Sequence, residues 1–250
     1  MFHNIIEFKA ADIYVDLKQD YPTPIKINIP DWFKKLEHKS HARTVKGCMP
    51  FLDTLMSGYC LYVPVDLEIK HNVDSEDKEG RPIKDSFAAC PLGRGAHDHG
   101  INLNHEGHPQ IHNIEQLAGS PLVSKNKDLP FYKILNPWHI KTPPGYSCLF
   151  LPPMNNADDR FSIIPGIVDT DTFHKEINFP IVLNGDKYPV LNTTIAKGTP
   201  YVQIIPFKRE SWKMKITKSK ASKNALNNLL YPFRFLHNYK KDIWKKKQYK

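Results

Sequence analysis

The sequence predicts a mainly β protein of the sandwich or barrel type. Between residues 131 and 207, short runs rich in β-branched and aromatic residues alternate with turn signals, as in all-β domains. The chain holds 21 prolines against 12 glycines. Proline disfavours helix interiors and central strands, so the elements should be short. With 250 residues, the chain is long enough to bury a substantial core.

The elements can be placed in order along the chain. A strand is expected within 5–17 and another over 59–69, where Pro64 indicates an edge or a bulge. Residues 31–39 should form a short helix capped by Asp31. Residues 71–109 are polar and lack a sustained period, so they are expected to form a loop with one short strand near Phe87. Further strands are predicted at 131–141, 146–151, 161–171, 177–184 and 194–207, with tight turns at 143–145 and 165–171.

Positive charge is concentrated at the C-terminal end. Residues 208–250 hold 14 Lys and Arg against two acids, a net charge of +12, whereas the other 207 residues carry −3. The chain is therefore divided into a β-rich body, 1–212, with its core at 131–207, and a basic helical tail, 213–250. Such asymmetry indicates an acidic partner for the tail.

The tail itself allows two interpretations. Its apolar residues recur every three or four positions, which predicts an amphipathic helix with a kink at Pro232. That helix can dock on the body through Leu226, Leu230, Phe233 and Trp244. Alternatively, its interleaved aromatic residues and lysines can bind nucleic acid or an acidic protein. The lysines assigned to an acidic partner are Lys240, Lys241, Lys245, Lys246 and Lys247.

Other features of the sequence bound the location of the protein. No apolar run approaches the ~20 residues that span a bilayer, and residues 1–21 do not resemble a secretory signal. We therefore expect a cytoplasmic protein of a host cell, or a virion component. Cys48, Cys60, Cys90 and Cys148 form no C-x-x-C pair and are expected to be reduced, mostly buried thiols. No cofactor and no metal ligand are assigned.

Several phrases carry a family resemblance. IKTPPGYSCLF, GIVDTDTF and KGTPYVQIIPFKRESWK resemble an uncharacterised family of marine tailed-phage and bacterial proteins over most of residues 40–213. This resemblance implies a phage-related protein and supplies no activity.

Residues 138–207 also resemble the β-clip fold of the dUTPase and dCTP deaminase family. Gly166, Ile167 and Asp169 match the start of its sugar-binding hairpin, and Gln203 falls in the later strand with the K-G pair before it. The resemblance implies a β-clip or sandwich-like domain with peripheral helices, and a ligand site near Asp169 and Gln203. The sequence departs from the family where PPMNNADDRF replaces the phosphate-binding segment. That departure puts nucleotide hydrolysis in doubt.

Two clusters of side chains are candidates for chemistry. Asp169 and Asp171 are two residues apart, so on a strand they share a face, where they can bind a cation or raise one another's pKa. On a turn, such a pair instead accepts bonds from local backbone donors. Five histidines within 97–112 can ligate a metal or form a solvated loop. Their spacing fits no zincin helix.

These observations favour a phage-related, non-catalytic binding or structural protein, used in the virion or in host takeover, whose basic tail meets an acidic partner. Homo-oligomers or virion assemblies fit the same function. One alternative is a nucleotide-binding or nucleotide-hydrolysing β-clip enzyme that uses Asp169, Asp171 and Gln203. A weaker alternative is a His-metal oxygenase built on residues 97–112.

Overall fold

The structure is a computed structural model that describes residues 4–10, 21–37, 39, 44–89, 111–218 and 239–250. It is mainly β and sandwich-like, with few helices, which confirms the predicted fold class. The strands are β1 (Glu7–Lys9), β2 (Thr23–Pro24), β3 (Tyr59–Tyr62), β4 (Leu67–Glu76), β5 (Pro82–Ala89), β6 (Ile111–His112), β7 (Phe131–Ile134), β8 (His139–Lys141), β9 (Tyr146–Leu151), β10 (Phe161–Ile163), β11 (Gly166–Val168), β12 (Phe179–Leu183), β13 (Val190–Ile195) and β14 (Pro200–Lys208).

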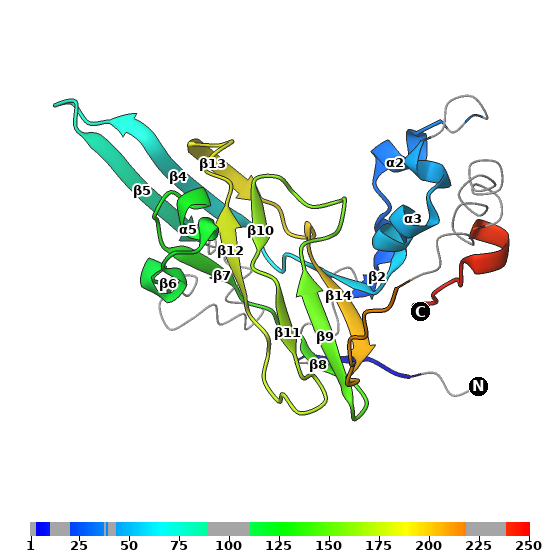
Figure 1. Ribbon diagram of the computed structural model, residues 1–250. Helices are drawn as coiled ribbons and strands as arrows, with labels where there is room; N and C mark the ends of the chain where they lie inside the picture. The colour runs from blue at the N-terminus through cyan, green and yellow to red at the C-terminus, as the bar shows by residue number, and fades with distance from the viewer. Residues whose placement is uncertain (1–3, 11–20, 38, 40–43, 90–110, 219–238) are drawn as a thin grey trace.

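The helical elements are short and lie around the strands (Figure 1). They are η2 (Ile25–Asn28), α2 (Asp31–Lys35), η3 (Val45–Gly47), α3 (Met49–Met56), η4 (Ile114–Leu117), α5 (Pro121–Lys125) and the π-helical turn η5 (Tyr239–Ile243). Asp31 is the first residue of α2 and does not cap it, because the N-cap position belongs to Pro30. Within the described residues, no helix is long and apolar enough to cross a membrane.

The described strands form four antiparallel sheets, ordered β11-β9-β14-β3-β2, β10-β12-β7-β6, β13-β4-β5 and β1-β8. The predicted strand at 194–207 is divided at Gly198, whose φ of +83° suits glycine, into β13 and β14 of different sheets. The predicted strand at 161–171 is likewise divided into β10 and β11. Tyr146 closes the expected turn by donating its backbone N–H to the Pro143 carbonyl. The second expected turn lies later than predicted, since 166–168 is a strand and the turn follows it.

The core lies between the five-stranded and four-stranded sheets. Phe150 of β9 and Tyr201 of β14 both contact the Phe179 ring of β12, with centroid distances of 5.5 and 5.7 Å. The buried cluster also includes Leu61 of β3 and Ile69 of β4, so the core extends beyond the predicted range of 131–207.

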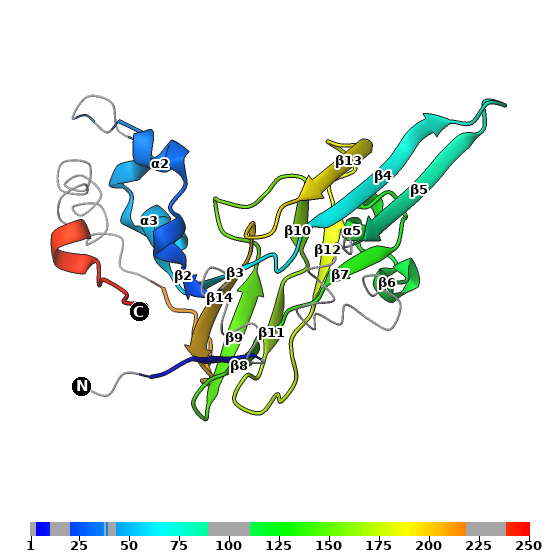
Figure 2. The same cartoon turned by 180° about the vertical axis from the view of Figure 1, so that it is seen from behind.

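The prediction of a loop over 71–109 is wrong for 71–76, which belong to β4, whereas the short strand expected near Phe87 is present as β5. β4 and β5 pair from Glu68↔Ala89 to Glu76↔Pro82, and Figures 1 and 2 show this hairpin projecting from one end of the molecule. At its tip, the Asp77 carboxylate accepts the backbone N–H groups of Glu79 and Arg81, each at 2.9 Å. Residues 90–110 of the predicted loop lie outside the described residues.

The opposite end of the molecule holds α2, α3 and residues 239–250, named here the C-terminal segment (Figures 1 and 2). Of the predicted tail helix, residues 219–238 lie outside the described part, including Leu226, Leu230 and Phe233. Residues 213–218 have no regular structure, and the C-terminal segment contains one π-helical turn, η5, in which Trp244 donates its backbone N–H to the Tyr239 carbonyl at 2.7 Å.

Candidate functional site

Asp171, one of the predicted ligand-binding carboxylates, serves to hold three parts of the body together. Its side chain is 6% exposed, and Arg209 binds it through both terminal nitrogens, at 2.8 and 2.5 Å. It also accepts the backbone N–H of Gly145 at 2.8 Å. These bonds, above all those from Arg209, lower the pKa of Asp171 to about 2. The carboxylate therefore joins the turn before β9, the turn after β11 and the end of β14.

Asp169 shares this cluster but stays more open. Its Oδ1 accepts the Ser147 hydroxyl at 2.6 Å and lies 3.3 Å from the Arg209 guanidinium, while the side chain remains 60% exposed. The two carboxylates thus face one guanidinium, which occupies the position that a cation would take. Of the two interpretations of this pair, the structure supports the one in which turn carboxylates satisfy local donors.

Gln203 does not meet Asp169 at a ligand pocket, which corrects the expectation from the β-clip resemblance. Its side chain is fully buried and its amide is used inside the protein. The Oε1 accepts the Met154 N–H at 2.8 Å, and the Nε2 donates to the carbonyls of Thr54 and Ser57 at 3.0 and 2.7 Å.

The register of β9 and β14 explains why these two residues are apart. Gln203 pairs with Leu151, whereas Phe207 pairs with Ser147, the residue that binds Asp169. Four residues of strand separate the two positions, which is about 13 Å. Gln203 therefore attaches α3 and its following turn to β14 and contacts no site shared with Asp169.

The turn after α3 is attached to the same strand by a close backbone approach. Gly58 has a φ of +85°, and a Cβ at this position would lie 1.9 Å from the Ile204 carbonyl oxygen. Only glycine fits such an approach without a shift of the backbone. Gly58 and Gln203 together fix α3 on β14.

α3 in turn holds the C-terminal segment. The Trp244 indole N–H lies 3.1 Å from both carboxylate oxygens of Asp53, and Lys247 forms an ion pair with the same carboxylate. The Tyr249 ring meets the Tyr59 ring edge to face, with centroids 5.8 Å apart. Lys26 donates to the Tyr249 carbonyl at 2.8 Å. Of the four residues expected to dock the tail on the body, Trp244 is therefore seen to do so.

The predicted tail lysines divide into two groups. Lys240, Lys245 and Lys246 are exposed, and within the described residues none of them forms an ion pair. Lys247 is engaged by Asp53, and the side chain of Lys241 lies outside what the structure describes. Docking of the segment therefore leaves three lysines exposed, of which Lys240 lines a small pocket beside Cys48 and Met49 of the body.

A second exposed stretch precedes the segment. After β14, residues 211–217 have no regular structure and are exposed throughout. Trp212, 88% exposed, is followed by Met214 and Ile216, and lysines stand at 213 and 215. In such an alternation, the aromatic ring can stack on a base and the lysines can bind phosphates of the same nucleic-acid strand.

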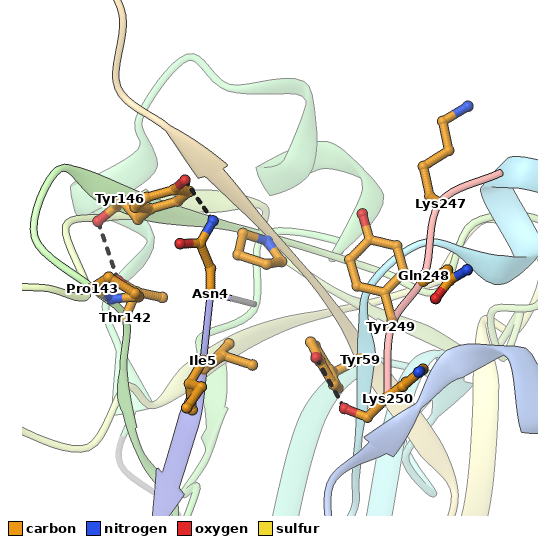
Figure 3. Close-up of a pocket in the computed structure, with 12 residues that line it drawn as sticks. Asn4, Ile5, Tyr59, Thr142, Pro143, Tyr146, Lys247, Gln248, Tyr249 and Lys250 are labelled. Atoms are coloured by element: carbon orange, nitrogen blue, oxygen red, sulfur yellow. Dashed lines mark hydrogen bonds between the residues drawn. The ribbon is translucent and has the colours of Figure 1, made fainter. Parts of the chain in front are cut away.

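A pocket of about 560 Å³ lies beside the docked segment (Figure 3). Figure 3 shows Lys247, Gln248 and Tyr249 on one side of it, and Asn4, Pro143 and Tyr146 on the other. Tyr59 and Lys250 line it as well, and no carboxylate side chain is among its lining residues. Its volume falls within the range of small-ligand sites.

The other candidate residues are described in part. His97, His99, His105 and His108 lie outside the described residues, and His112 bonds Gln116 through Nδ1 at 2.6 Å. Within the described part, no group of three potential ligands is placed to hold a metal. Burial raises the pKa of the Cys60 and Cys148 thiols to about 12 and about 11, so both are held as thiols. Cys48 is exposed, contrary to expectation, and Cys90 lies outside the described residues.

No protein-family model matches the chain, and no curated protein matches it. The case for a function therefore rests on the residues above. Sequence reasoning missed Asp53, Tyr59 and Arg209, because each acquires its role from a partner more than 35 residues away, which no local pattern signals.

Proposed function

We propose that this chain is a phage-related, non-catalytic binding protein whose C-terminal segment holds nucleic acid. The observation that supports the proposal is the division of the tail between anchoring residues and exposed lysines. Trp244, Lys247 and Tyr249 contact the body, while Lys240, Lys245 and Lys246 remain exposed. A docked polycation presents its charges in a fixed arrangement, which lowers the entropic cost of binding a polyanion.

Aromatic side chains favour nucleic acid over an acidic protein as the partner. Trp212 is exposed between basic residues, and Tyr249 lines a pocket next to the lysines of the C-terminal segment. Bases stack on such rings without regard to sequence, whereas an acidic protein surface offers them little. Residues 1–207 carry −3 and are nearly neutral, so the +12 of residues 208–250 is the part of the chain that should attract a polyanion.

The hydrogen bonds made by the residues of the predicted enzyme site favour the non-catalytic function over the enzymatic one. Asp171 is held by Arg209, and Gln203 is buried with its amide bonded to α3 and its turn. A residue whose polar atoms are already occupied would have to break those bonds to meet a substrate. We place the protein in the host cytoplasm or in the virion, and mass spectrometry of purified virions distinguishes the two locations.

Retention on immobilised polyanions tests the proposal. At low salt, the full chain should bind a single-stranded oligonucleotide more tightly than poly-glutamate of equal charge, because only the oligonucleotide offers bases to the exposed rings. Equal or tighter binding to poly-glutamate would assign the segment to an acidic protein partner. Binding to neither would end the proposal.

A further inference from the structure

We infer that the pocket between Tyr59, Tyr146 and Tyr249 takes a single unpaired base, so that the nucleic acid bound by this protein is single-stranded. This inference rests on the proposed function and specifies its ligand. The pocket is open, measures about 560 Å³ and is built from the N-terminal strand region, the turn before β9 and the C-terminal segment.

The walls of the pocket suit a flat ring. Three tyrosines line it, together with Ile5, Ile6 and Pro206, so most of its surface is apolar. Tyr59 meets both Tyr249 and Phe8 edge to face, with centroids 5.8 and 5.6 Å apart, whereas within the described residues the Tyr146 ring stacks on no other ring. A base has a π-face whatever its sequence, so it can stack on a ring that these contacts leave open.

Polar groups at the rim suit the edge of a base and its phosphate. Asn4 reaches in with a side-chain amide that donates to the Tyr146 hydroxyl at 2.7 Å, and Gln248 supplies a second amide. Amides offer both donors and acceptors, which a base edge requires. Lys250 lines the same pocket and brings a cationic side chain for the phosphate.

The pocket is also continuous with the exposed lysines. Lys246 precedes Lys250 by four residues, so the two side chains start within about 14 Å of each other along the backbone. A strand whose phosphates lie on Lys245 and Lys246 can therefore place a neighbouring base in the pocket. A duplex cannot do so without unpairing that base, which costs a few kcal/mol.

An abasic oligonucleotide tests this inference separately from the proposed function. Fluorescence anisotropy compares a labelled oligothymidylate with an abasic strand of equal length and charge. We expect the full chain to bind oligothymidylate at least about tenfold more tightly, given the strength of base–aromatic stacking. If both strands bind equally well, the pocket inference is wrong and the proposed function stands. If neither strand binds, both are wrong.

Substitutions in the pocket test whether the preference for oligothymidylate arises there. Ile5 lines the pocket and is 73% exposed, so Ile5→Trp fills the space without disturbing the core. It should abolish the preference for oligothymidylate and leave abasic binding unchanged. The matched control Ile27→Trp, at a residue 59% exposed and outside the lining, should keep the preference. Tyr249→Leu removes a stacking ring and should also abolish the preference for oligothymidylate. A preference that survives both pocket variants would place the base elsewhere and overturn the inference.

Discussion

In the body, the polar side chains near the predicted site bond to neighbouring parts of the body, whereas in the C-terminal segment several lysine side chains are exposed. Asp171 and Gln203 each form three or more hydrogen bonds with other residues of the fold. Lys245 and Lys246 are exposed and form no ion pair within the described residues. The difference teaches that residues matching a ligand-binding motif can instead form hydrogen bonds within the fold. Lysines that outnumber the nearby carboxylates remain available to bind a partner.

The largest loss of stability is expected at the contact between β14 and the turn after α3, the helix that binds the C-terminal segment. Gly58→Ala would force a Cβ to 1.9 Å from the Ile204 carbonyl at a φ of +85°. We expect the free energy of unfolding to fall by about 3 kcal/mol or more, because the strain of the backbone adds to overpacking. Urea denaturation measures it, and Gly119→Ala, also at positive φ but with open space around it, controls for the dihedral strain alone. Equal losses in the two variants would contradict the close approach.

Gln203→Leu tests whether this residue is structural. It leaves the Met154 N–H and the carbonyls of Thr54 and Ser57 without their partner in a partly buried position. The expected loss is about 3 kcal/mol in the free energy of unfolding, since each orphaned buried group costs about 1–3 kcal/mol and relaxation recovers part of that cost. Thermal unfolding with and without deoxynucleotides checks the result. An unchanged stability joined to lost nucleotide stabilisation would restore the ligand role.

His71 of β4 is an exception to the pattern of the body. It is buried, and within the described residues neither ring nitrogen has a hydrogen-bond partner. Burial lowers its pKa below 6.5, and the Lys127 ammonium lowers it further. The unfolded chain then binds the proton more readily, so stability should fall as the pH falls below 6.5.

His71→Leu should remove this pH dependence and cost little at neutral pH, because a neutral unpaired ring is replaced by an apolar side chain. Unfolding curves between pH 7.5 and 5, a range chosen to span the titration of histidine, compare the two proteins. A pH profile that is the same in both would assign the effect to other groups.

The anchors of the C-terminal segment should affect local order more than global stability. Trp244→Ala removes the indole bonded to Asp53, and we expect it to lower the free energy of unfolding by about 1 kcal/mol. Hydrogen exchange across residues 239–250 should rise well beyond that of the strands, since the segment opens locally. Protection unchanged in the variant would show that Tyr249 and Lys247 suffice to hold it.

The parts of this structure that sequence reasoning anticipated are those fixed by local chemistry. The turn at Pro143-Pro144-Gly145 and the strand after it form as expected, because proline and glycine set the backbone there. The strand predicted at 131–141 is instead divided into β7 and β8, which belong to different sheets. Of the β4–β5 hairpin, the sequence predicts the strand near Phe87 but not the outer half of β4, which lacks an apolar alternation although Asp77 and Gly80 mark the turn. The roles of Arg209 and Asp53 depend on tertiary neighbours, and so does the pocket, which combines residues 4–6 with 247–250.

The salt dependence of oligonucleotide binding tests the central claim most directly. Each lysine–phosphate contact with a single strand contributes about 0.7 to the slope of log affinity against log salt concentration. Replacing Lys240, Lys245 and Lys246 with glutamine should reduce that slope by about 2. Replacing the exposed lysines of the body, Lys70, Lys78 and Lys175, should leave the slope unchanged. A slope that falls equally in both variants, or in neither, would contradict the assignment of binding to the exposed lysines of the docked segment.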